Sequence, residues 1–361
     1  MTRLALLAVA VVLSVFLALP PLASARVPRD FVGITAEDVF AGDAGYRQRN
    51  LNLQRRLGIG LIRQTFDWST IERSPGRYDF SYHDEFVASA ARRGITVLPI
   101  LFRAPAFRAR SHPAGFACPP RRNAAFAAFA RAVVRRYGRR GTLWRERPRL
   151  RKLPIRSWQV WNEPNLAQYW CGRPRAKRYV AMLRVVGRAI KRADRRADVV
   201  TAGIPPSKLR GAVRIGKYIR QLYAAGARKH FDSLAINSYA RDHRELRALL
   251  RSIRRVMNRR GDRRGRIWIT ELGWGDRGPK SRFIVGPRGQ ARQISKSLAF
   301  IRKQRRRLGL RGFVYYSWRD SAPYPPKYKD LWGLHTGLLR RNGSPKRAYR
   351  AFGRRARAFR R

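Results

Sequence analysis

The chain has 361 residues, 44% of them hydrophobic, which is enough for a sizeable core, and no internal repeat or low-complexity linker marks a second domain. Its 81 Lys and Arg against 21 Asp and Glu give a formal net charge of +60, which first suggests nucleic-acid binding, but there is no helix-turn-helix, zinc-finger or RNP-type pattern. An anionic extracellular polymer suits this charge better than nucleic acid, and a compositional drift toward arginine on solvated helix faces is an equally good explanation.

Residues 1–25 have the pattern of a secretory signal peptide. A short basic region precedes the apolar run from Leu4 to Leu19, and Ala23-Ser24-Ala25 is a small-residue cleavage site. An uncleaved membrane anchor is the alternative, because the apolar run is long enough, but Pro20-Pro21 and the cleavage pattern favour removal. We therefore expect a secreted, extracellular or cell-wall-associated chain of residues 26–361 that keeps no stable membrane span.

The mature chain alternates between short β runs and helical stretches. Glycine often follows a helical stretch, which is ordinary for a helix end before a strand, whereas Pro99 is unusual inside a strand. The expected strands are 31–34, 61–66, 95–101, 155–161, 198–202, 231–237, 266–271 and 312–317, and the expected helices are 46–57, 81–93, 123–137, 177–193, 213–225, 242–258 and 289–308. Eight such units predict the α/β class and a single (β/α)8 TIM barrel.

Two of these strands end in a glutamate. Glu163 closes Trp158-Gln159-Val160-Trp161-Asn162 and is followed by Pro164, which cannot donate to a strand ladder. Glu271 closes Arg266-Ile267-Trp268-Ile269-Thr270. In a parallel barrel the C-terminal strand ends carry the catalytic groups, although a strand ended by a polar turn explains either stretch alone. Two carboxyl groups facing one sugar are what hydrolysis of a glycosidic bond requires.

Asn162-Glu163-Pro164 and Thr270-Glu271-Leu272-Gly273 resemble the two motifs of glycoside hydrolase clan A, and the resemblance extends over nearly all of the mature chain. The segment 66–80 is most similar to the branch with β-xylosidases and α-L-iduronidases, family 39, and related cellulase-like proteins. The resemblance implies a retaining glycosidase of carbohydrate metabolism that acts on O-glycosyl bonds of oligo- or polysaccharides, with Glu163 as acid/base and Glu271 as nucleophile. The alternative is an inactive carbohydrate- or polyanion-binding barrel at the cell surface.

The same resemblance implies a set of substrate-site residues. Arg63, at the second strand, is expected near the nucleophile, Tyr239 is expected to hydrogen-bond it, and Asn162 is expected to bind the sugar 2-hydroxyl. The family's frequent His-Pro-Tyr appears here as Asn237-Ser238-Tyr239, so this chain has no histidine at the end of the sixth strand to take the role of the family's histidine.

Four tryptophans fall at or just after strand ends, where indole rings stack on sugar faces. Of these, Trp318 follows the eighth strand, where clan A often has a tryptophan under the reacting sugar. Core packing is the alternative for each of them. The tryptophans are Trp68, Trp170, Trp274 and Trp318.

Cys118 and Cys171 are the two cysteines of an exported chain, and both fall in loops after neighbouring strands, so we expect a disulfide, with two free thiols as the alternative. We expect no metal and no cofactor. The five histidines are scattered without zinc-site spacing, and no glycine-rich nucleotide loop follows a strand.

The arginine clusters fall near the ends of predicted helices. In a barrel the helix C-termini gather opposite the strand exits, so the clusters are expected on the face away from catalysis, where cations also suit the helix dipoles. We hypothesise that this face holds the protein on an anionic wall polymer. The clusters are Arg135-Arg136, Arg139-Arg140, Arg195-Arg196, Arg254 to Arg264, Arg305 to Arg307 and Arg354 to Arg361.

Overall fold

The computed structural model describes residues 27–111, 113, 115–323 and 330–360. The expected signal peptide, residues 1–25, lies outside the described residues. Within the described ranges, no helix combines the length and the apolar character needed to cross a membrane.

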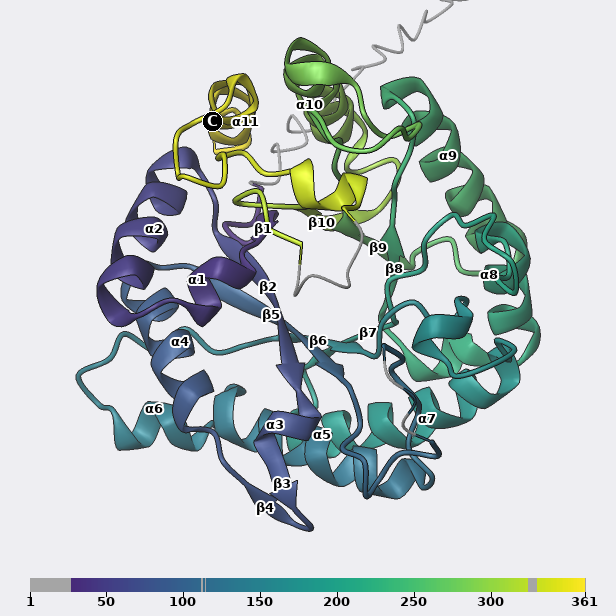
Figure 1. The fold of residues 1–361 in the computed structure, drawn as a ribbon. Helices are drawn as coiled ribbons and strands as arrows, with labels where there is room; N and C mark the ends of the chain where they lie inside the picture. Colours follow the sequence, from purple (N-terminus) through teal and green to yellow (C-terminus); the bar gives the residue numbers. More distant parts are fainter. Residues whose placement is uncertain (1–26, 112, 114, 324–329, 361) are drawn as a thin grey trace, which may run out of the picture.

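Eight parallel strands close into a barrel that is surrounded by helices (Figure 1). Around the barrel the order is β1-β10-β9-β8-β7-β6-β5-β2, so neighbours in sequence are neighbours in space. The strands are β1 Val32–Thr35, β2 Leu61–Asp67, β5 Thr96–Phe102, β6 Ser157–Val160, β7 Asp198–Val200, β8 Ser233–Asn237, β9 Arg266–Glu271 and β10 Leu310–Tyr315. The predicted α/β class and (β/α)8 barrel are confirmed.

The helices follow the expected order, with additions between them. Those expected from sequence are α2 Ala44–Leu57, α4 Ser81–Arg92, α5 Asn123–Tyr137, α7 Ala176–Ala193, α8 Ile215–Ala224, α9 His243–Arg259 and α10 Gly286–Gln304. The additions are α1 Glu37–Ala41, α3 Trp68–Ile71, α6 Thr142–Glu146, η1 Ala167–Tyr169, η2 Ala227–His230, η3 Trp332–His335, α11 Arg347–Arg357 and the hairpin of β3 Glu72–Ser74 with β4 Arg77–Tyr78. Of these, only a last helix was expected, because the tail from Asp330-Leu331-Trp332-Gly333-Leu334 to Ala348-Tyr349-Arg350-Ala351-Phe352 resembles clan A barrels, which often finish with a loop and a last helix.

Pro99 does lie inside β5, opposite Gln64 of β2. Pairing of β5 with β6 is found only at Ile100 and Leu101, beyond the proline. A residue without an N–H is tolerated where the ladder has a partner on one side only.

The interior of the barrel is filled by side chains. Trp268 is the largest of them, and a Cβ atom at Gly312 would lie 2.3 Å from its ring, so the indole needs a glycine at that position. A second, larger core lies between the strands and the helices. The interior cluster comprises Leu61, Leu98, Val200, Ala235, Trp268 and Val314. Because this interior is packed, a substrate site belongs at the strand ends.

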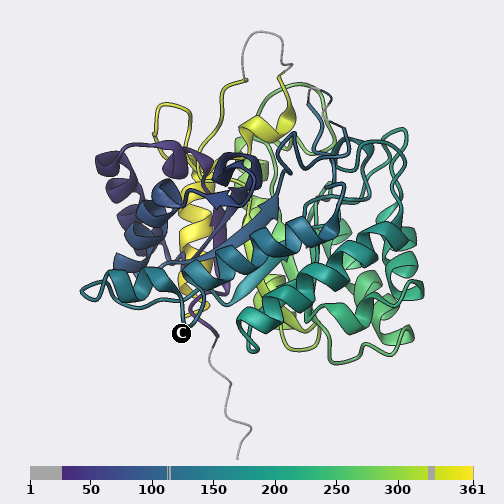
Figure 2. The ribbon, with the colours of Figure 1, turned by 90° about the horizontal axis from the view of Figure 1, so that it is seen from below.

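The two ends of the barrel differ in what they carry. The C-terminal ends of the strands, called the strand exits below, lie at one end of the barrel, where η3 is the short yellow helix near the top of Figure 2. The C-terminus lies at the opposite end, with the start of β1 and the ends of the surrounding helices (Figure 2). Residues at the C-terminal ends of the strands and residues at the C-terminal ends of the helices therefore lie on opposite faces of the barrel.

Candidate active site

Glu163 follows β6 at the end of the barrel where the strands exit. Its backbone N–H donates to the carbonyl of Gly203, beyond β7, at 3.1 Å. Trp161 and Glu163 both have left-handed backbone angles, with φ of +72° and +45°. Such conformations cost on the order of 1–3 kcal/mol each in non-glycine residues and cluster at active sites. The backbone around Glu163 therefore has a mark of function that is independent of the motif.

Glu271 closes β9 and accepts two hydrogen bonds through its carboxylate. Arg63 donates from Nη1 to Oε1 at 2.8 Å, and Tyr239 donates its hydroxyl to Oε2 at 2.5 Å. Glu271 is buried, with 8% of its surface exposed. An ionised carboxylate only accepts hydrogen bonds, so a guanidinium donor and a hydroxyl donor together suit a carboxylate at this position.

Arg63 holds several parts of the site together. Its Nη1 contacts Glu271, its Nε donates to Oε1 of Gln159 at 2.9 Å, and its Nη2 donates to Oδ1 of Asn162 at 3.0 Å. The Arg63 side chain is 3% exposed. Since Oδ1 of Asn162 is occupied by Arg63, its Nδ2 amide is the group left to meet a sugar hydroxyl.

The two glutamates differ in their surroundings. Burial raises the pKa of Glu163 to about 8, the negative charge of Glu271 adds to this, and Asn237 and Arg63 oppose it. At neutral pH the Glu163 carboxyl group therefore holds its proton. A protonated carboxylic acid beside a carboxylate held by Arg63 and Tyr239 is the division of roles that acid-assisted bond cleavage needs.

Asn237, at the end of β8, lies beside Glu163 and stands where the His-Pro-Tyr motif of clan A has its histidine. Its Nδ2 donates to Oε1 of Glu163 at 2.6 Å. The hydroxyl of Thr270 donates to Oδ1 of Asn237 at 2.8 Å, which fixes the amide with its NH2 group toward Glu163. A neutral amide thus orients the acid without a titrating partner.

Sequence reasoning missed a third carboxylate, Glu37, which follows β1. Nε2 of Gln64 donates to its Oε2 at 2.9 Å, and its side chain stays exposed to solvent. Surrounding protein atoms partly desolvate the carboxyl group although solvent reaches it, and this raises its pKa, while Gln64, Arg63 and Arg103 oppose the rise. Glu37 could have been found by examining the polar residues that follow every predicted strand, and not only those that follow the fourth and seventh strands.

The tryptophans expected to stack on sugar are core side chains in the structure. Trp68, Trp274 and Trp318 have no exposed surface, and Trp170 is also buried. Trp318 donates its indole N–H to Oδ1 of Asn50 on α2, at 2.9 Å. A ring without exposed surface cannot stack on a sugar, so the stacking expected for these residues is corrected to core packing. Trp318 lies beyond β10, which ends at Tyr315, and its indole is directed to α2 and not to the site.

Another set of aromatic rings lies beside Glu271 instead. The ring of Trp332, in η3, is 5.0 Å from that of Tyr239 and 4.5 Å from that of Phe283, centroid to centroid. Tyr316 lies 6.4 Å from Tyr239. All four rings are partly exposed, so they form an aromatic wall next to Glu271. The only sequence signal was the similarity of the tail around Asp330 to Leu334 to clan A barrels.

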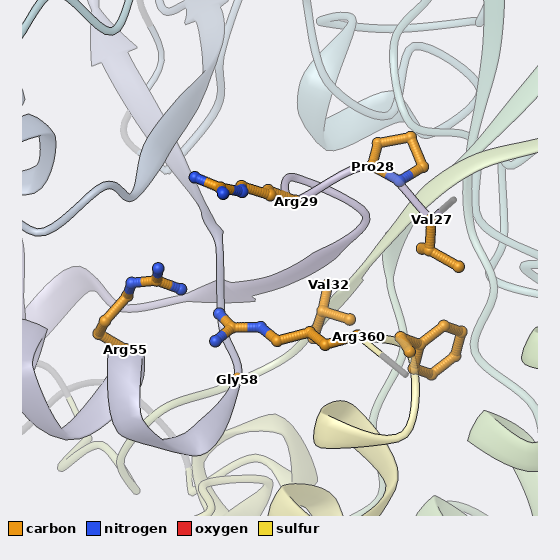
Figure 3. Close-up of a pocket in the computed structure, with 8 residues that line it drawn as sticks. Val27, Pro28, Arg29, Val32, Arg55, Gly58 and Arg360 are labelled. Atoms are coloured by element: carbon orange, nitrogen blue, oxygen red, sulfur yellow. The ribbon is translucent and has the colours of Figure 1, made fainter. Parts of the chain in front are cut away.

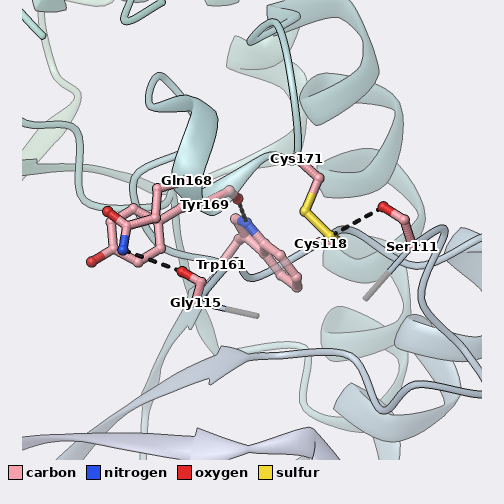
Figure 4. The surroundings of a disulfide bond; sticks show 7 residues. All are labelled: Ser111, Gly115, Cys118, Trp161, Gln168, Tyr169 and Cys171. Carbon is pink, nitrogen blue, oxygen red and sulfur yellow. Dashed lines mark hydrogen bonds between the residues drawn. A yellow bond between two sulfur atoms is a disulfide. The ribbon is translucent and has the colours of Figure 1, made fainter. Parts of the chain in front are cut away.

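Cys118 and Cys171 are joined by a disulfide in the structure, with their Cα atoms 5.0 Å apart, within the usual range (Figure 4). The bond ties the loop after β5 to the residues just after η1, and Gln168 Nε2 in η1 also donates to the Gly115 carbonyl at 3.2 Å. Nearby, Trp161 donates its indole N–H to the carbonyl of Tyr169 at 2.8 Å. The disulfide therefore braces the segment next to Glu163. Among the described residues, no group of His, Cys, Asp and Glu side chains is arranged to hold a metal ion.

No family sequence model matches the chain, and no curated protein matches it by sequence. Solved structures with the same fold include a family 39 glycoside hydrolase from the gut symbiont Bacteroides cellulosilyticus WH2, with a TM-score of 0.65 and 19% identity over 92% of this chain. Another is the family 39 enzyme from Xanthomonas axonopodis pv. citri, with a TM-score of 0.66 and 17% identity over 91% of this chain. The present chain spans 64% and 66% of these two proteins.

Xylanase 10B from Thermotoga petrophila RKU-1, solved with xylobiose, matches at a TM-score of 0.60 and 15% identity, over 91% of this chain and 94% of its own. The structural neighbours are therefore glycoside hydrolases, family 39 among them, as the resemblance to clan A implied. At these identities the likeness establishes the shared barrel fold.

Proposed function

We propose that this chain is a secreted glycoside hydrolase that cleaves O-glycosidic bonds by double displacement with retention of configuration. The observation that carries the proposal is the unequal pair at the strand ends. Glu163 holds its proton at neutral pH because of burial and the charge of Glu271, while Glu271 accepts hydrogen bonds from Arg63 and Tyr239. The barrel shared with family 39 glycoside hydrolases supports the same reaction class.

In the first step the Glu271 carboxylate attacks the anomeric carbon of a sugar, and the bond to the leaving oxygen breaks as Glu163 gives it a proton. A glycosyl ester on Glu271 results. In the second step Glu163, now a carboxylate, takes a proton from water as the water displaces Glu271. Two inversions at one carbon leave the configuration unchanged.

Three further groups are proposed to contact the sugar. Asn162 offers its Nδ2 amide to the 2-hydroxyl, because Oδ1 is engaged by Arg63. Glu37 offers a carboxylate to other hydroxyls, and the partly exposed ring of Trp332 offers a stacking face beside Tyr239. These contacts support an oligo- or polysaccharide substrate.

The deciding experiment compares Glu163→Ala and Glu271→Ala on aryl glycosides, with and without azide. Both variants should lose nearly all hydrolysis. In Glu163→Ala, azide should restore turnover and give a glycosyl azide of retained configuration, because azide takes the place of water in the second step. In Glu271→Ala, azide should give a glycosyl azide of inverted configuration, because it takes the place of the nucleophile. Wild-type-like turnover in either variant overturns the proposal. Carbohydrate binding by the wild type without any turnover would identify an inactive binding barrel instead.

We also propose that the face opposite the strand exits attaches the protein to an anionic polymer. A pocket of about 880 Å³ between the ends of α5 and α7 is lined by five arginines, and none of their guanidinium groups forms an ion pair with a described residue. Asp194 is the one acidic residue in that lining. The lining arginines are Arg139, Arg140, Arg192, Arg195 and Arg196.

Two other arginines of the predicted clusters serve the fold instead. Arg254 is buried and donates to the carbonyls of Gly265 and Leu308, at 2.7 and 2.6 Å. Arg136 forms ion pairs with Asp84 and Glu146. The proposed attachment face is therefore narrower than the charge clusters in the sequence indicate.

A further inference from the structure

A second arginine-lined cavity lies near the start of β1, on the barrel end away from Glu163 and Glu271. Its volume is about 180 Å³, which corresponds to roughly six waters at their liquid volume, so it suits a group of a few heavy atoms. Arg29, Arg55 and Arg360 line it together with apolar residues (Figure 3). The apolar lining residues are Val27, Pro28, Val32 and Phe359.

The three guanidinium groups point toward one another in Figure 3. The pKa of Arg360 is lowered by burial first and then by the positive charges of Arg55 and Arg29, so the three groups lie within electrostatic reach. Among the described residues, none of the three guanidinium groups has a hydrogen-bond or ion-pair partner. The nearby carboxylate of Asp30 accepts two hydrogen bonds from Arg311 instead.

Each arginine is held by a different part of the fold. Arg29 lies in a turn closed by the hydrogen bond from Phe31 N to Pro28 O, at 3.0 Å. The main chain there packs so closely on Gly60 that a Cβ at Gly60 would lie 1.8 Å from the Arg29 carbonyl oxygen. This backbone position is therefore fixed on the barrel.

Arg55 belongs to the last turn of α2, which ends at Gly58 with φ of +101°. A left-handed residue at a helix end is readily supplied by glycine. Arg360 follows α11, next to Phe359, whose ring packs on Phe31 with 5.3 Å between centroids. The three charges are thus brought together by a turn, a helix end and the C-terminal segment.

We propose that Arg29, Arg55 and Arg360 form a binding site for one phosphate group, either free or as the monoester of a small molecule. Three like charges at short range repel one another, and a tetrahedral dianion would offset that repulsion. It would also accept hydrogen bonds from the N–H groups of each guanidinium. The apolar walls lower the local dielectric and strengthen the attraction. Phosphate chemistry is favoured over a long polymer because the cavity is small. The site does not depend on the proposed glycosidase activity.

The test is calorimetric titration of the purified protein with inorganic phosphate and, separately, with glycerol 3-phosphate, at constant ionic strength set by chloride. Saturable binding of either compound is expected. Arg55→Gln and Arg360→Gln should each weaken it by about tenfold or more, because each removes a charge-assisted donor. Tighter binding of the ester than of phosphate identifies an esterified ligand, and the reverse order identifies free phosphate.

Arg306→Gln is the matched control, since Arg306 is an exposed arginine at the same barrel end. It should leave phosphate affinity unchanged. Equal weakening in Arg306→Gln and Arg55→Gln would show general charge attraction and overturn the site, as would the absence of saturable binding to the wild type. Circular dichroism of each variant checks that the barrel remains folded.

Discussion

Arg63 and Glu271 are 208 residues apart in the sequence, yet Nη1 of Arg63 donates to Oε1 of Glu271 at 2.8 Å. The contact exists because β2 and β9 both end at the same face of a closed barrel. The same guanidinium group also holds Gln159 and Asn162. One side chain therefore orients the proposed nucleophile and one proposed sugar-binding amide together.

Arg63→Gln should lower kcat by about 10² to 10³-fold, the range seen when one preorganised donor is removed from an active site. Glu271 would lose its charged donor, and Asn162 would lose the group that orients its amide. Steady-state kinetics on an aryl glycoside measure the effect. Arg254→Gln is the control, because Arg254 is also a buried arginine but binds only backbone carbonyls. Both variants should lose stability, so an equal loss of kcat per folded molecule in Arg254→Gln would contradict the role of Arg63.

The proton on Glu163 predicts a pH profile. With a pKa of about 8, kcat/KM should be maintained at neutral pH and fall above about pH 8, as the acid loses its proton. Asn237 donates a hydrogen bond that lowers this pKa, so Asn237→Ala should move the alkaline limb to higher pH. Asn258→Ala, at an exposed asparagine at the end of α9, should leave the profile unchanged. An unmoved limb in Asn237→Ala would contradict the assignment.

The same group predicts a stability effect. The pKa of Glu163 is raised from 4.5 in an ordinary setting to about 8 in the fold, so the folded state binds the extra proton between these values. Stability must then fall as pH rises through that window. Glu163→Gln removes the titration, so its Tm relative to the wild type should rise from pH 4.5 to pH 8. Thermal melts across this range measure the difference, and a difference that is constant with pH would show that Glu163 does not titrate there.

Sequence reasoning located the barrel and both glutamates because these depend on local patterns. Apolar runs that follow a helix-ending glycine, such as Gly58 or Gly94, mark several strands. A parallel barrel brings every strand end to one face, which places Arg63 and Tyr239 beside Glu271. The aromatic wall could not be found in this way. Trp332 lies in η3, beyond β10, and its contact with Tyr239 depends on tertiary packing. Trp318 was expected under the sugar from the resemblance to clan A, but β10 ends at Tyr315 and the indole of Trp318 packs in the core.

The two tryptophans therefore give opposite predictions. Trp332→Ala should raise KM for an oligosaccharide several-fold to about tenfold, because a stacking face worth roughly 0.5–1.5 kcal/mol is lost, while Tm changes little. Trp318→Ala should destabilise the fold by about 3–5 kcal/mol, because it empties a fully buried site, and should leave KM of the folded fraction unchanged. Kinetics and denaturant unfolding of both variants separate the two roles. A KM effect in Trp318→Ala alone would restore the sequence-based assignment.

If the basic face binds an anionic polymer, polymer binding and hydrolysis should respond differently to salt. Residues 194–197 connect the end of α7 to the start of β7, so the arginine pocket there lies away from the strand exits. Retention on anionic cell-wall material should fall steeply with salt, because the screening length shortens to about 3 Å at 1 M. Hydrolysis of a neutral aryl glycoside should follow a different salt dependence, since the substrate carries no charge.

A pair of double variants tests which surface of the protein makes this attachment. Arg195→Gln with Arg196→Gln removes two charges from the pocket, and Arg73→Gln with Arg77→Gln removes two exposed charges from the β3–β4 hairpin, beyond the exit of β2. Equal net charge is lost, so attraction by total charge alone would weaken retention equally in both. We expect the first pair to elute at clearly lower salt than the second, with hydrolysis of the neutral substrate preserved. Equal elution of the two pairs, or salt-insensitive retention of the wild type, would show that the arginine pocket is not the attachment site.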